Sequence, residues 1–274
     1  MTQNLLVEKR NQIAIVTLNR PEVRNAFDDV LIADLTKAFR DLDQDKEVVA
    51  VVLAGAGPAF CAGADLNWMK RMAGYGYEQN LADANALADM LKALDRLSKP
   101  TIARVHGPAY AGGVGLVAAC DIAIGSHEAE FCLTEVKLGL SPATISPYVV
   151  RAMGARLARR YFLTGEKIDA GEAYRLRLLS DVSSREELDG AVNAILGHIV
   201  AGGRAAHAAI KDLIRNVSGA APDEATIADT ARRIAEIRVS PEGKEGIASF
   251  LEKRKPSWVK EFETVRVKPP RKKK

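Results

Sequence analysis

The stretch that decides the fold is Phe60-Cys61-Ala62-Gly63-Ala64-Asp65-Leu66, which follows the apolar run from Val48 to Ala54 and precedes a helix-like segment. Small residues at such a turn let the backbone approach a ligand closely, and the first amides of a helix have no partner of their own. Amide hydrogens at the positive end of a helix suit a carbonyl oxygen that becomes negative during a reaction. The stretch therefore predicts a turn with free donors at the end of a buried strand.

A second stretch repeats this arrangement. The strand-like run Thr101–Val105 leads into His106-Gly107-Pro108-Ala109-Tyr110-Ala111-Gly112-Gly113-Val114-Gly115-Leu116, and an apolar helix continues through Cys120. Either turn alone is better explained by close packing than by a functional site. Two turns that each aim an N–H group at one point would form an oxyanion hole, in which one donor is typically worth about 10²- to 10³-fold in turnover.

The rest of the chain alternates strand-like and helix-like segments up to about residue 146. Apolar residues at helical spacing predict helices over 29–42 and 77–97, and β-branched runs predict strands between them. This alternation predicts right-handed βαβ crossovers and an α/β fold. Beyond residue 146 the pattern is helical, and the Pro- and Lys-rich tail from 265 to 274 is expected to be disordered.

Bulk composition excludes several classes of protein. Apolar residues make up 47% of the 274 residues, yet no apolar run reaches the roughly 20 residues of a membrane span. The N-terminus resembles no signal peptide, so a cytoplasmic protein is expected. The three cysteines and four histidines show no metal-site spacing, and neither a metal nor a redox cofactor is expected. Cys61 is interpreted as apolar filler and not as a nucleophile.

The net charge of +4 comes from the C-terminal end. Residues 252–274 carry ten Lys or Arg and three Glu, a net of +7, so the remainder is near −3. A tail such as Arg271-Lys272-Lys273-Lys274 could bind nucleic acid through phosphates. No aromatic residue is interleaved with these basic residues and no nucleic-acid module is recognised, so the tail is interpreted as solubilising.

Five blocks in a fixed order resemble the enoyl-CoA hydratase/isomerase superfamily, the crotonases. They are Leu18–Ala26, Phe60–Leu66, His106–Asp121, Phe131–Leu140 and Gly246–Arg254. The resemblance implies a spiral of ββα units, a C-terminal helical region that packs in trimerisation, and a homotrimer or homohexamer. We expect an acyl-CoA-binding core over 1–200, the helical region over 201–262 and a basic disordered tail over 263–274.

The resemblance also implies roles for single residues. The thioester carbonyl would lie between the backbone amides of Ala64 and Gly112. Coenzyme A would contact the first loop and the adenine pocket, through Val23, Arg24, Ala26, Ala62, Asp65 and Leu66. Trp68, Tyr148 and Lys253 are further candidates, the first two for the acyl pocket and the last for a phosphate in a neighbouring subunit.

The acid and base residues depart from the family pattern. Hydratases of this type usually carry two glutamates; here the first position is Gly115 and the second is Glu135. The apolar neighbours of Glu135 predict a raised pKa, which suits proton transfer near neutral pH. A structural Glu135 paired with Lys137 is the alternative. Glu130 is the runner-up carboxylate and is expected to face solvent.

A single glutamate leaves two reactions open. The enzyme is either a hydratase that adds water across a 2,3 double bond or an enoyl-CoA delta-isomerase that moves a proton between carbons. The sequences of two segments, Ala111–Asp121 and Glu135–Val149, resemble those of bacterial methylglutaconyl-CoA and isohexenylglutaconyl-CoA hydratases. Those enzymes act in leucine and acyclic-terpene breakdown. Our hypothesis is that space beside Gly115 admits a branched or carboxylated acyl chain.

Overall fold

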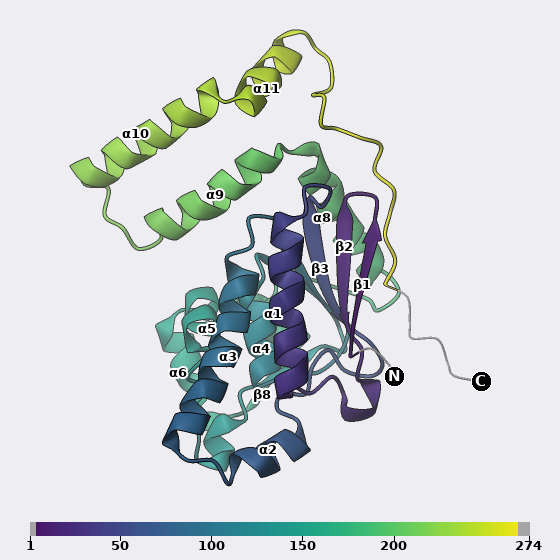
Figure 1. Ribbon diagram of the computed structural model, residues 1–274, viewed down its shortest axis with the longest axis vertical. Coiled ribbons are helices and arrows are strands. Elements are labelled where there is room, and N and C mark those ends of the chain that lie inside the picture. Colours follow the sequence, from purple (N-terminus) through teal and green to yellow (C-terminus); the bar gives the residue numbers. More distant parts are fainter. Residues whose placement is uncertain (1–3, 268–274) are drawn as a thin grey trace.

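The computed structural model describes residues 4–267, and a six-stranded sheet forms the centre of this part of the chain (Figure 1). The spatial order is β1-β2-β3-β4-β6-β9, with β1 and β2 antiparallel and every later pair parallel. The strands are β1 (Leu5–Arg10), β2 (Ile13–Leu18), β3 (Ala50–Gly55), β4 (Thr101–Val105), β6 (Ile122–Ser126) and β9 (Asp181–Ser183). A smaller sheet joins β5 (Ala109–Tyr110), β7 (Glu130–Cys132) and β8 (Lys167–Asp169).

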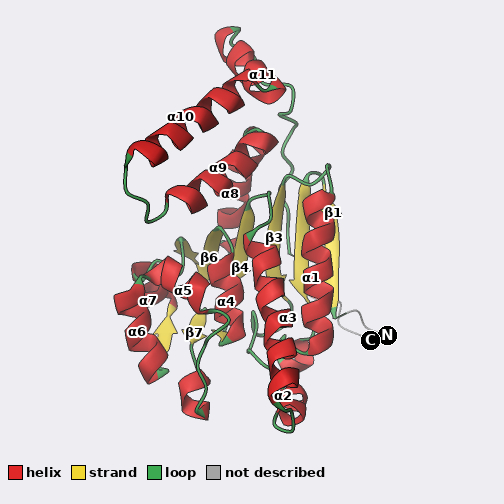
Figure 2. Ribbon diagram, turned by 60° about the vertical axis from the view of Figure 1, so that its left-hand side comes forward, coloured by secondary structure: helices red, strands yellow, loops and turns green. Residues whose placement is uncertain are grey.

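Helices alternate with these strands, which confirms the α/β class. The bounds are η1 (Pro21–Val23), α1 (Asp29–Gln44), α2 (Leu66–Met72), α3 (Tyr77–Asp95), α4 (Gly112–Ala119), η2 (Glu135–Leu138), α5 (Ser146–Met153), α6 (Ala155–Thr164), α7 (Ala170–Arg175), α8 (Leu188–Ala201), α9 (Arg204–Val217), α10 (Glu224–Val239) and α11 (Pro241–Leu251). Figure 2 shows the helices around the sheet, with α1 and α3 over one face. None of the helices in residues 4–267 is both long and apolar enough to cross a membrane.

Both faces of the central sheet are buried, which explains the uninterrupted apolar runs of its strands. On β2, Ala14 and Val16 pack with α1, α3 and α4, whereas Ile13 and Ile15 pack with α8 on the opposite face. Successive side chains of a strand point to opposite faces of the sheet. When both faces are buried, every position along the strand therefore requires an apolar residue. This double burial fixes the strand register that brings the two predicted turns together.

The last three helices, α9 to α11, extend away from the sheet at the top of Figure 1. Their exposed apolar side chains include Ile210, Ile214, Ile227, Val239, Ile247 and Phe250. The chain then returns to the sheet (Figure 1). The division into a core over 1–200 and a helical region over 201–262 stays a prediction.

The expectation of disorder from residue 263 onward is wrong for residues 263–267. Val265 is only 3% exposed and packs in the cluster between the sheet and α8, together with Phe262 and Val267. Both backbone groups of Val265 bond to the Asn193 side chain, at 2.7 Å each. The sequence argument counted Pro and Lys and overlooked alternate apolar residues in this segment. Residues 268–274, which hold most of the basic tail, lie outside the described residues.

Two truncations separate these parts of the tail. Removing residues 262–274 should lower the free energy of unfolding by about 2–4 kcal/mol, because it exposes apolar surface on α8 and removes both bonds of the Asn193 side chain to Val265, leaving its bond to Asp189. Removing residues 268–274 should leave the free energy of unfolding unchanged. Urea unfolding monitored by circular dichroism compares both with the full chain, and equal stability of the two truncated proteins would contradict an anchored segment.

Candidate active site

Three chain segments lie side by side at the centre of the candidate site. Ala109 pairs in parallel with Cys61 on one side and with Phe131 on the other. The amides of Phe60 and Cys61 donate to the carbonyl of Pro108, at 3.0 and 3.1 Å. Because the three segments run in the same direction, the residues that follow them emerge at one edge.

The residues at that edge are the predicted ones. Ala64 follows the first segment, Gly112 follows the middle one and Glu135 follows the third. Backbone bonds continue the alignment beyond the paired residues, since the amide of Ala111 donates to the carbonyl of Cys132 at 2.8 Å. The middle segment therefore places Gly112 between Ala64 on one side and the chain leading to Glu135 on the other.

The amide of Ala64 points away from the core. The carbonyl of Gly63 accepts from the amide of Phe27 at 2.6 Å, and the N–H and C=O of one trans peptide point in opposite directions. The Ala64 N–H group is therefore directed away from Phe27, and it donates to no acceptor within residues 4–267. Ala64 itself is half-buried, so the N–H group is within reach of a ligand.

The amide of Gly112 points out of the N-terminus of α4. The carbonyl of Ala111 accepts from the amides of Val114 (2.9 Å) and Gly115 (3.4 Å), so the N–H group of the same peptide faces the opposite way. It has no acceptor in the described part of the chain. Ala111 reaches this orientation at φ 47°, ψ −116°, a left-handed conformation that costs about 1–3 kcal/mol in a residue with a side chain.

Close packing requires the glycines of both turns. A Cβ on Gly112 would lie 2.7 Å from the Phe27 ring, and a Cβ on Gly113 would lie 2.5 Å from the carbonyl oxygen of Cys61. Gly63, at φ 90°, leaves only 3.1 Å to the Cβ of Ala111 for an added carbon. The two turns touch through their backbones, so a side chain at Gly113 would force them apart.

Glu135 begins η2 and carries no counter-ion. Its Oε2 atom is buried without a hydrogen-bond partner within residues 4–267. Burial raises the pKa of this carboxyl, and a bond from its own amide lowers it to a smaller extent. The predicted rise of the pKa is thus confirmed, and Lys137 forms no ion pair with it. An unpaired, half-buried carboxylate at the chain edge suits proton transfer.

Glu130 differs in every respect from Glu135. It accepts a hydrogen bond from the Tyr110 hydroxyl and forms an ion pair with Lys167 at 3.0 Å. The Tyr110 bond is the largest cause that lowers the pKa of Glu130, with Lys167 adding to it. Glu130 is therefore ionised near neutral pH and already has partners, which leaves Glu135 as the candidate acid and base.

The loop from Arg20 to Phe27 is fastened to the first turn. The carbonyl of Arg24 accepts from the amide of Ala62 at 3.0 Å, while its guanidinium is exposed and forms no ion pair within the described residues. Ala26 is buried, and both its backbone groups bond inside the loop, so it shapes the loop and offers no free group. The backbone N–H and C=O of Val23 are likewise engaged within the loop.

Sequence reasoning missed the residues that hold this loop. Asn25 is fully buried at φ 58° and donates from its side chain to the carbonyls of Ala56 and Ala59, both at 2.8 Å. Arg20 pairs with Asp65 at 3.1 Å and with Asp28 at 2.9 Å. The signal available in the sequence was an Asn at a turn, since Asn tolerates left-handed conformations.

Asp65 and Trp68 are structural and not free for a substrate. The carboxylate of Asp65 accepts from the amides of Asn67 and Trp68, its amide donates to Phe27, and it pairs with Arg20. Its side chain caps α2, and the predicted contact of its backbone with the adenine stays a prediction. Trp68 is 4% exposed in the main core and donates from its indole to Asp83. Leu66, by contrast, is 74% exposed beside the turn.

The hypothesis of open space beside Gly115 is wrong. A Cβ on Gly115 would lie 2.3 Å from Cγ2 and 2.9 Å from Cβ of Ile145, and 3.6 Å from Leu91. The volume that a side chain would need is filled by the core, so Gly115 offers no pocket to an acyl chain. The sequence could not reveal this, because Ile145 follows a loop whose path is set by tertiary packing.

The roles of Tyr148 in the acyl pocket and of Lys253 in phosphate binding stay predictions. The centre of the Tyr148 ring lies 5.6 Å from the Arg151 guanidinium. Burial raises the pKa of the Tyr148 hydroxyl, and the negative charge of Asp95, at the end of α3, raises this pKa as well. Lys253 follows α11, at the opposite end of the molecule from α2 (Figure 1). A contact of Lys253 with coenzyme A would therefore have to be made in another subunit.

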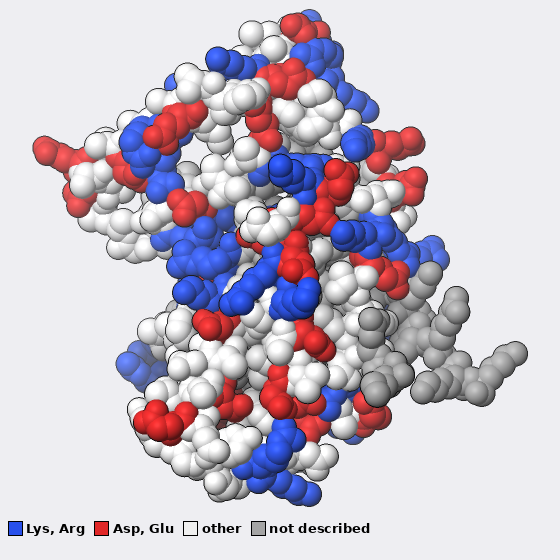
Figure 3. Space-filling model, viewed as in Figure 1, with Lys and Arg blue, Asp and Glu red and all other residues white. Residues whose placement is uncertain are grey.

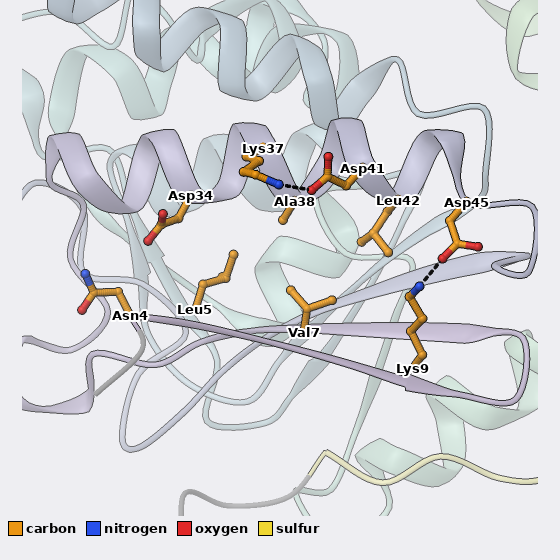
Figure 4. A pocket seen from close by; sticks show the side chains of 10 residues that line it. All are labelled: Asn4, Leu5, Val7, Lys9, Asp34, Lys37, Ala38, Asp41, Leu42 and Asp45. Atoms are coloured by element: carbon orange, nitrogen blue, oxygen red, sulfur yellow. Dashed lines mark hydrogen bonds and ion pairs between the residues drawn. The ribbon is translucent and has the colours of Figure 1, made fainter. Parts of the chain in front are cut away.

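A groove of about 590 Å³ between β1 and α1 is lined by none of the predicted site residues (Figure 4). Its cations are paired, Lys37 with Asp41 and Lys9 with Asp45. Lys and Arg are interspersed with Asp and Glu over the face shown in Figure 3. Within residues 4–267 no cluster of His, Cys, Asp and Glu could hold a metal ion, and burial raises the pKa of the Cys61 thiol to about 12.

Comparison with known proteins gives one consistent result. The family described as enoyl-CoA hydratase/isomerase matches residues 8–261. A short-chain-enoyl-CoA hydratase of Clostridium acetobutylicum is 31% identical over 92% of this chain and 96% of its own length. Solved enoyl-CoA hydratases of Shewanella pealeana (42% identity, TM-score 0.91, covering 93% and 96% of the two chains) and Mycobacterium smegmatis (36%, 0.88, 94% and 99%) share the fold.

Proposed function

The chain belongs to the enoyl-CoA hydratase/isomerase family, and from this premise we propose that it adds water across the 2,3 double bond of an enoyl-CoA. The predicted crotonase-like fold agrees with the solved relatives. One observation carries the proposal: the amides of Ala64 and Gly112, which have no acceptor within residues 4–267, follow two adjacent chain segments, and the next segment leads to Glu135.

The two amides would hold the oxygen of the thioester carbonyl. As water adds to C3 of the substrate, electrons move from the double bond onto this oxygen, and an enolate forms. Hydrogen bonds from Ala64 and Gly112 stabilise the developing negative charge more than the neutral carbonyl, which lowers the barrier. The N-terminus of α4 adds its positive end to this site.

Glu135 would move the proton. As a base it takes a proton from water while the water oxygen bonds to C3; as an acid it returns that proton to C2 when the enolate collapses. One carboxyl group can perform both steps because the first step leaves it protonated. Its raised pKa suits both roles, because burial makes the carboxylate a stronger base and the protonated form easier to reach than in an exposed glutamate.

The coenzyme A portion would lie along the first loop and the first turn. The exposed guanidinium of Arg24 is available to a phosphate group, and guanidinium groups bind phosphate well. The exposed Leu66 and the half-buried Val23 and Ala62 line the same region.

A branched or carboxylated acyl group, such as that of 3-methylglutaconyl-CoA, remains our more specific proposal. Its support is now the likeness of residues 111–121 and 135–149 to hydratases of such substrates, together with the absence of a second carboxylate at Gly115. A negatively charged acyl group would meet one glutamate in place of two, which reduces repulsion. Space beside Gly115 no longer supports it.

Double-bond migration is the second candidate reaction. Ile145 fills the position where a second glutamate would stand, so among residues 4–267 Glu135 is the carboxylate with a buried, unpartnered oxygen. A single carboxyl group that shuttles a proton between C2 and C4 would give an isomerase.

A turnover screen with the purified protein separates these proposals. It compares crotonyl-CoA, 3-methylglutaconyl-CoA, isohexenylglutaconyl-CoA and a 3-enoyl-CoA, and identifies each product by mass. Hydration adds 18 Da to the substrate, whereas isomerisation leaves its mass unchanged. Faster hydration of crotonyl-CoA than of both glutaconyl substrates would remove the branched-substrate proposal.

We also propose a homotrimer, or a hexamer of two trimers, with α9 to α11 at subunit contacts. The support is the exposed apolar set on these helices, which includes Phe250 at 82% exposure. Sedimentation equilibrium measures the mass directly. A monomer at micromolar concentration would contradict this proposal.

A further inference from the structure

A chain of polar side chains crosses the small sheet directly beneath the second turn. The Tyr110 hydroxyl on β5 donates to Glu130 on β7, and Glu130 in turn pairs with Lys167 on β8. The three strands are neighbours in the order β5-β7-β8. The chain therefore ties β5, which ends just before Ala111, to its neighbour β7 and, through Glu130 on β7, to β8.

Backbone pairing holds β5 over a short length only. It pairs with β7 at two positions, Ala109 with Phe131 and Tyr110 with Cys132, and with the first turn through the single bridge from Ala109 to Cys61. Yet the residue that follows, Ala111, adopts the strained conformation that aims the Gly112 amide. A strained residue keeps its conformation only where its surroundings fix it strongly. The hydrogen bond from the side chain of Tyr110, the residue immediately before Ala111, would supply such a constraint; we call this bond to Glu130 the tie.

We propose that Tyr110 and Glu130 are positioning residues, which fix β5 against β7 and thereby direct the N–H group of Gly112 at the substrate carbonyl. The inference rests on the proposed function, because it assigns them a role in the same site. Neither residue needs to touch the substrate. Tyr110 acts through the peptide that follows it, and Glu130 acts through Tyr110.

The tie is stable across the working pH range. Burial and the bond to Glu130 raise the pKa of Tyr110 to about 12, so the hydroxyl keeps its proton. The same bond holds the pKa of Glu130 below its usual value, so the acceptor stays ionised. A protonated donor facing an ionised acceptor gives a stronger hydrogen bond than two neutral groups.

The test compares Tyr110→Phe with a matched control. Tyr161→Phe removes the same kind of bond, from a tyrosine hydroxyl to Glu172 at 3.0 Å, on α6 away from the turns. We expect Tyr110→Phe to lower kcat about tenfold with KM nearly unchanged, less than the 10²- to 10³-fold loss of a whole donor. Tyr161→Phe should leave kcat unchanged. Glu130→Gln should retain most of the activity because Gln still accepts from Tyr110, whereas Glu130→Ala should match Tyr110→Phe.

A spectroscopic readout makes the test independent of turnover. Butyryl-CoA is saturated at C2 and C3 and cannot be hydrated, so the infrared stretch of its bound thioester carbonyl reports the hydrogen bonds to that oxygen. The downward shift of this frequency should be smaller in Tyr110→Phe than in the unmodified protein and in Tyr161→Phe. A shift without any hydration of enoyl-CoA substrates would overturn the proposed reaction and leave the inference standing.

Two results would overturn the inference itself. One is equal kcat and equal carbonyl frequency in Tyr110→Phe and Tyr161→Phe. The other is a loss that appears in KM alone, which would mean that Tyr110 contacts coenzyme A and does not direct the amide. In the double variant Tyr110→Phe/Glu130→Ala, kcat should be no lower than in either single variant, because both changes break one bond.

Discussion

Replacing Glu135 by Gln is expected to lower kcat for hydration by about 10³-fold or more. A general acid or base typically contributes about 10²- to 10⁴-fold to the rate. Gln has nearly the same shape but neither accepts a proton from water nor returns one to C2. The structure offers no substitute, because Glu130 is already bonded to Tyr110 and Lys167. Stopped assays with the best substrate of the screen measure the loss. Activity within tenfold of the unmodified protein would exclude Glu135 as the proton carrier.

The same substitution should not weaken the fold. The folded-state pKa of Glu135 is raised above its value of 4.5 in an unfolded chain, chiefly by burial. Whatever stability this group contributes is therefore fully present below the unfolded pKa and is lost as the pH rises through the folded pKa. Gln remains neutral throughout, so the Tm of the variant should equal or exceed that of the unmodified protein at pH 7, and the difference should shrink toward pH 4.

For a second carboxylate, Glu166, the expected effect of the same substitution on stability at pH 7 has the opposite sign. Glu166 is held by Arg160 at 2.7 Å, and this bond lowers its pKa. Its stability contribution is present above the unfolded pKa and is lost as the pH falls through the folded pKa. Glu166→Gln should thus leave kcat unchanged and, if it shifts the Tm at all, lower it at pH 7. A Tm at pH 7 lower in Glu135→Gln than in Glu166→Gln would contradict an unpaired, desolvated Glu135.

The parts of the site that the sequence predicted depend on residues that are close together along the chain. Small residues after apolar runs located the turns at Ala64 and Gly112, and apolar neighbours indicated the raised pKa of Glu135. The alternation of strands and helices also follows from local periodicity. These features depend on residues within a few positions of each other, so one sequence is enough to find them.

The failures all concern what fills a space or satisfies a group from elsewhere in the chain. Gly115 suggested room that Ile145 occupies. Val265 was assigned to a disordered tail, yet Asn193 binds its backbone from 72 positions away. A sequence shows which residues can donate hydrogen bonds and how large each side chain is, but not which distant residues they contact.

Gly113→Ala is the variant with the second largest expected effect. The added Cβ would lie 2.5 Å from the carbonyl oxygen of Cys61 and 3.0 Å from the Cys61 Cβ. Both obstacles belong to the first turn near its backbone, so they cannot rotate away as the end of a long side chain would. The second turn must then move away from the first. We expect kcat to fall about 10²-fold or more, because both oxyanion donors lose their common target.

Gly190→Ala is the control for the change of residue type. Gly190 lies in α8 with nothing within 4 Å of an added Cβ, so the substitution should raise the free energy of unfolding by about 0.5–1 kcal/mol and leave kcat unchanged. Gly113→Ala should lower both quantities, and the frequency shift of bound butyryl-CoA should decrease with kcat. If Gly113→Ala folds and keeps kcat within twofold, the spacing of the two turns does not set the geometry of the donors. The thioester oxygen would then have to be held by other groups than the amides of Ala64 and Gly112.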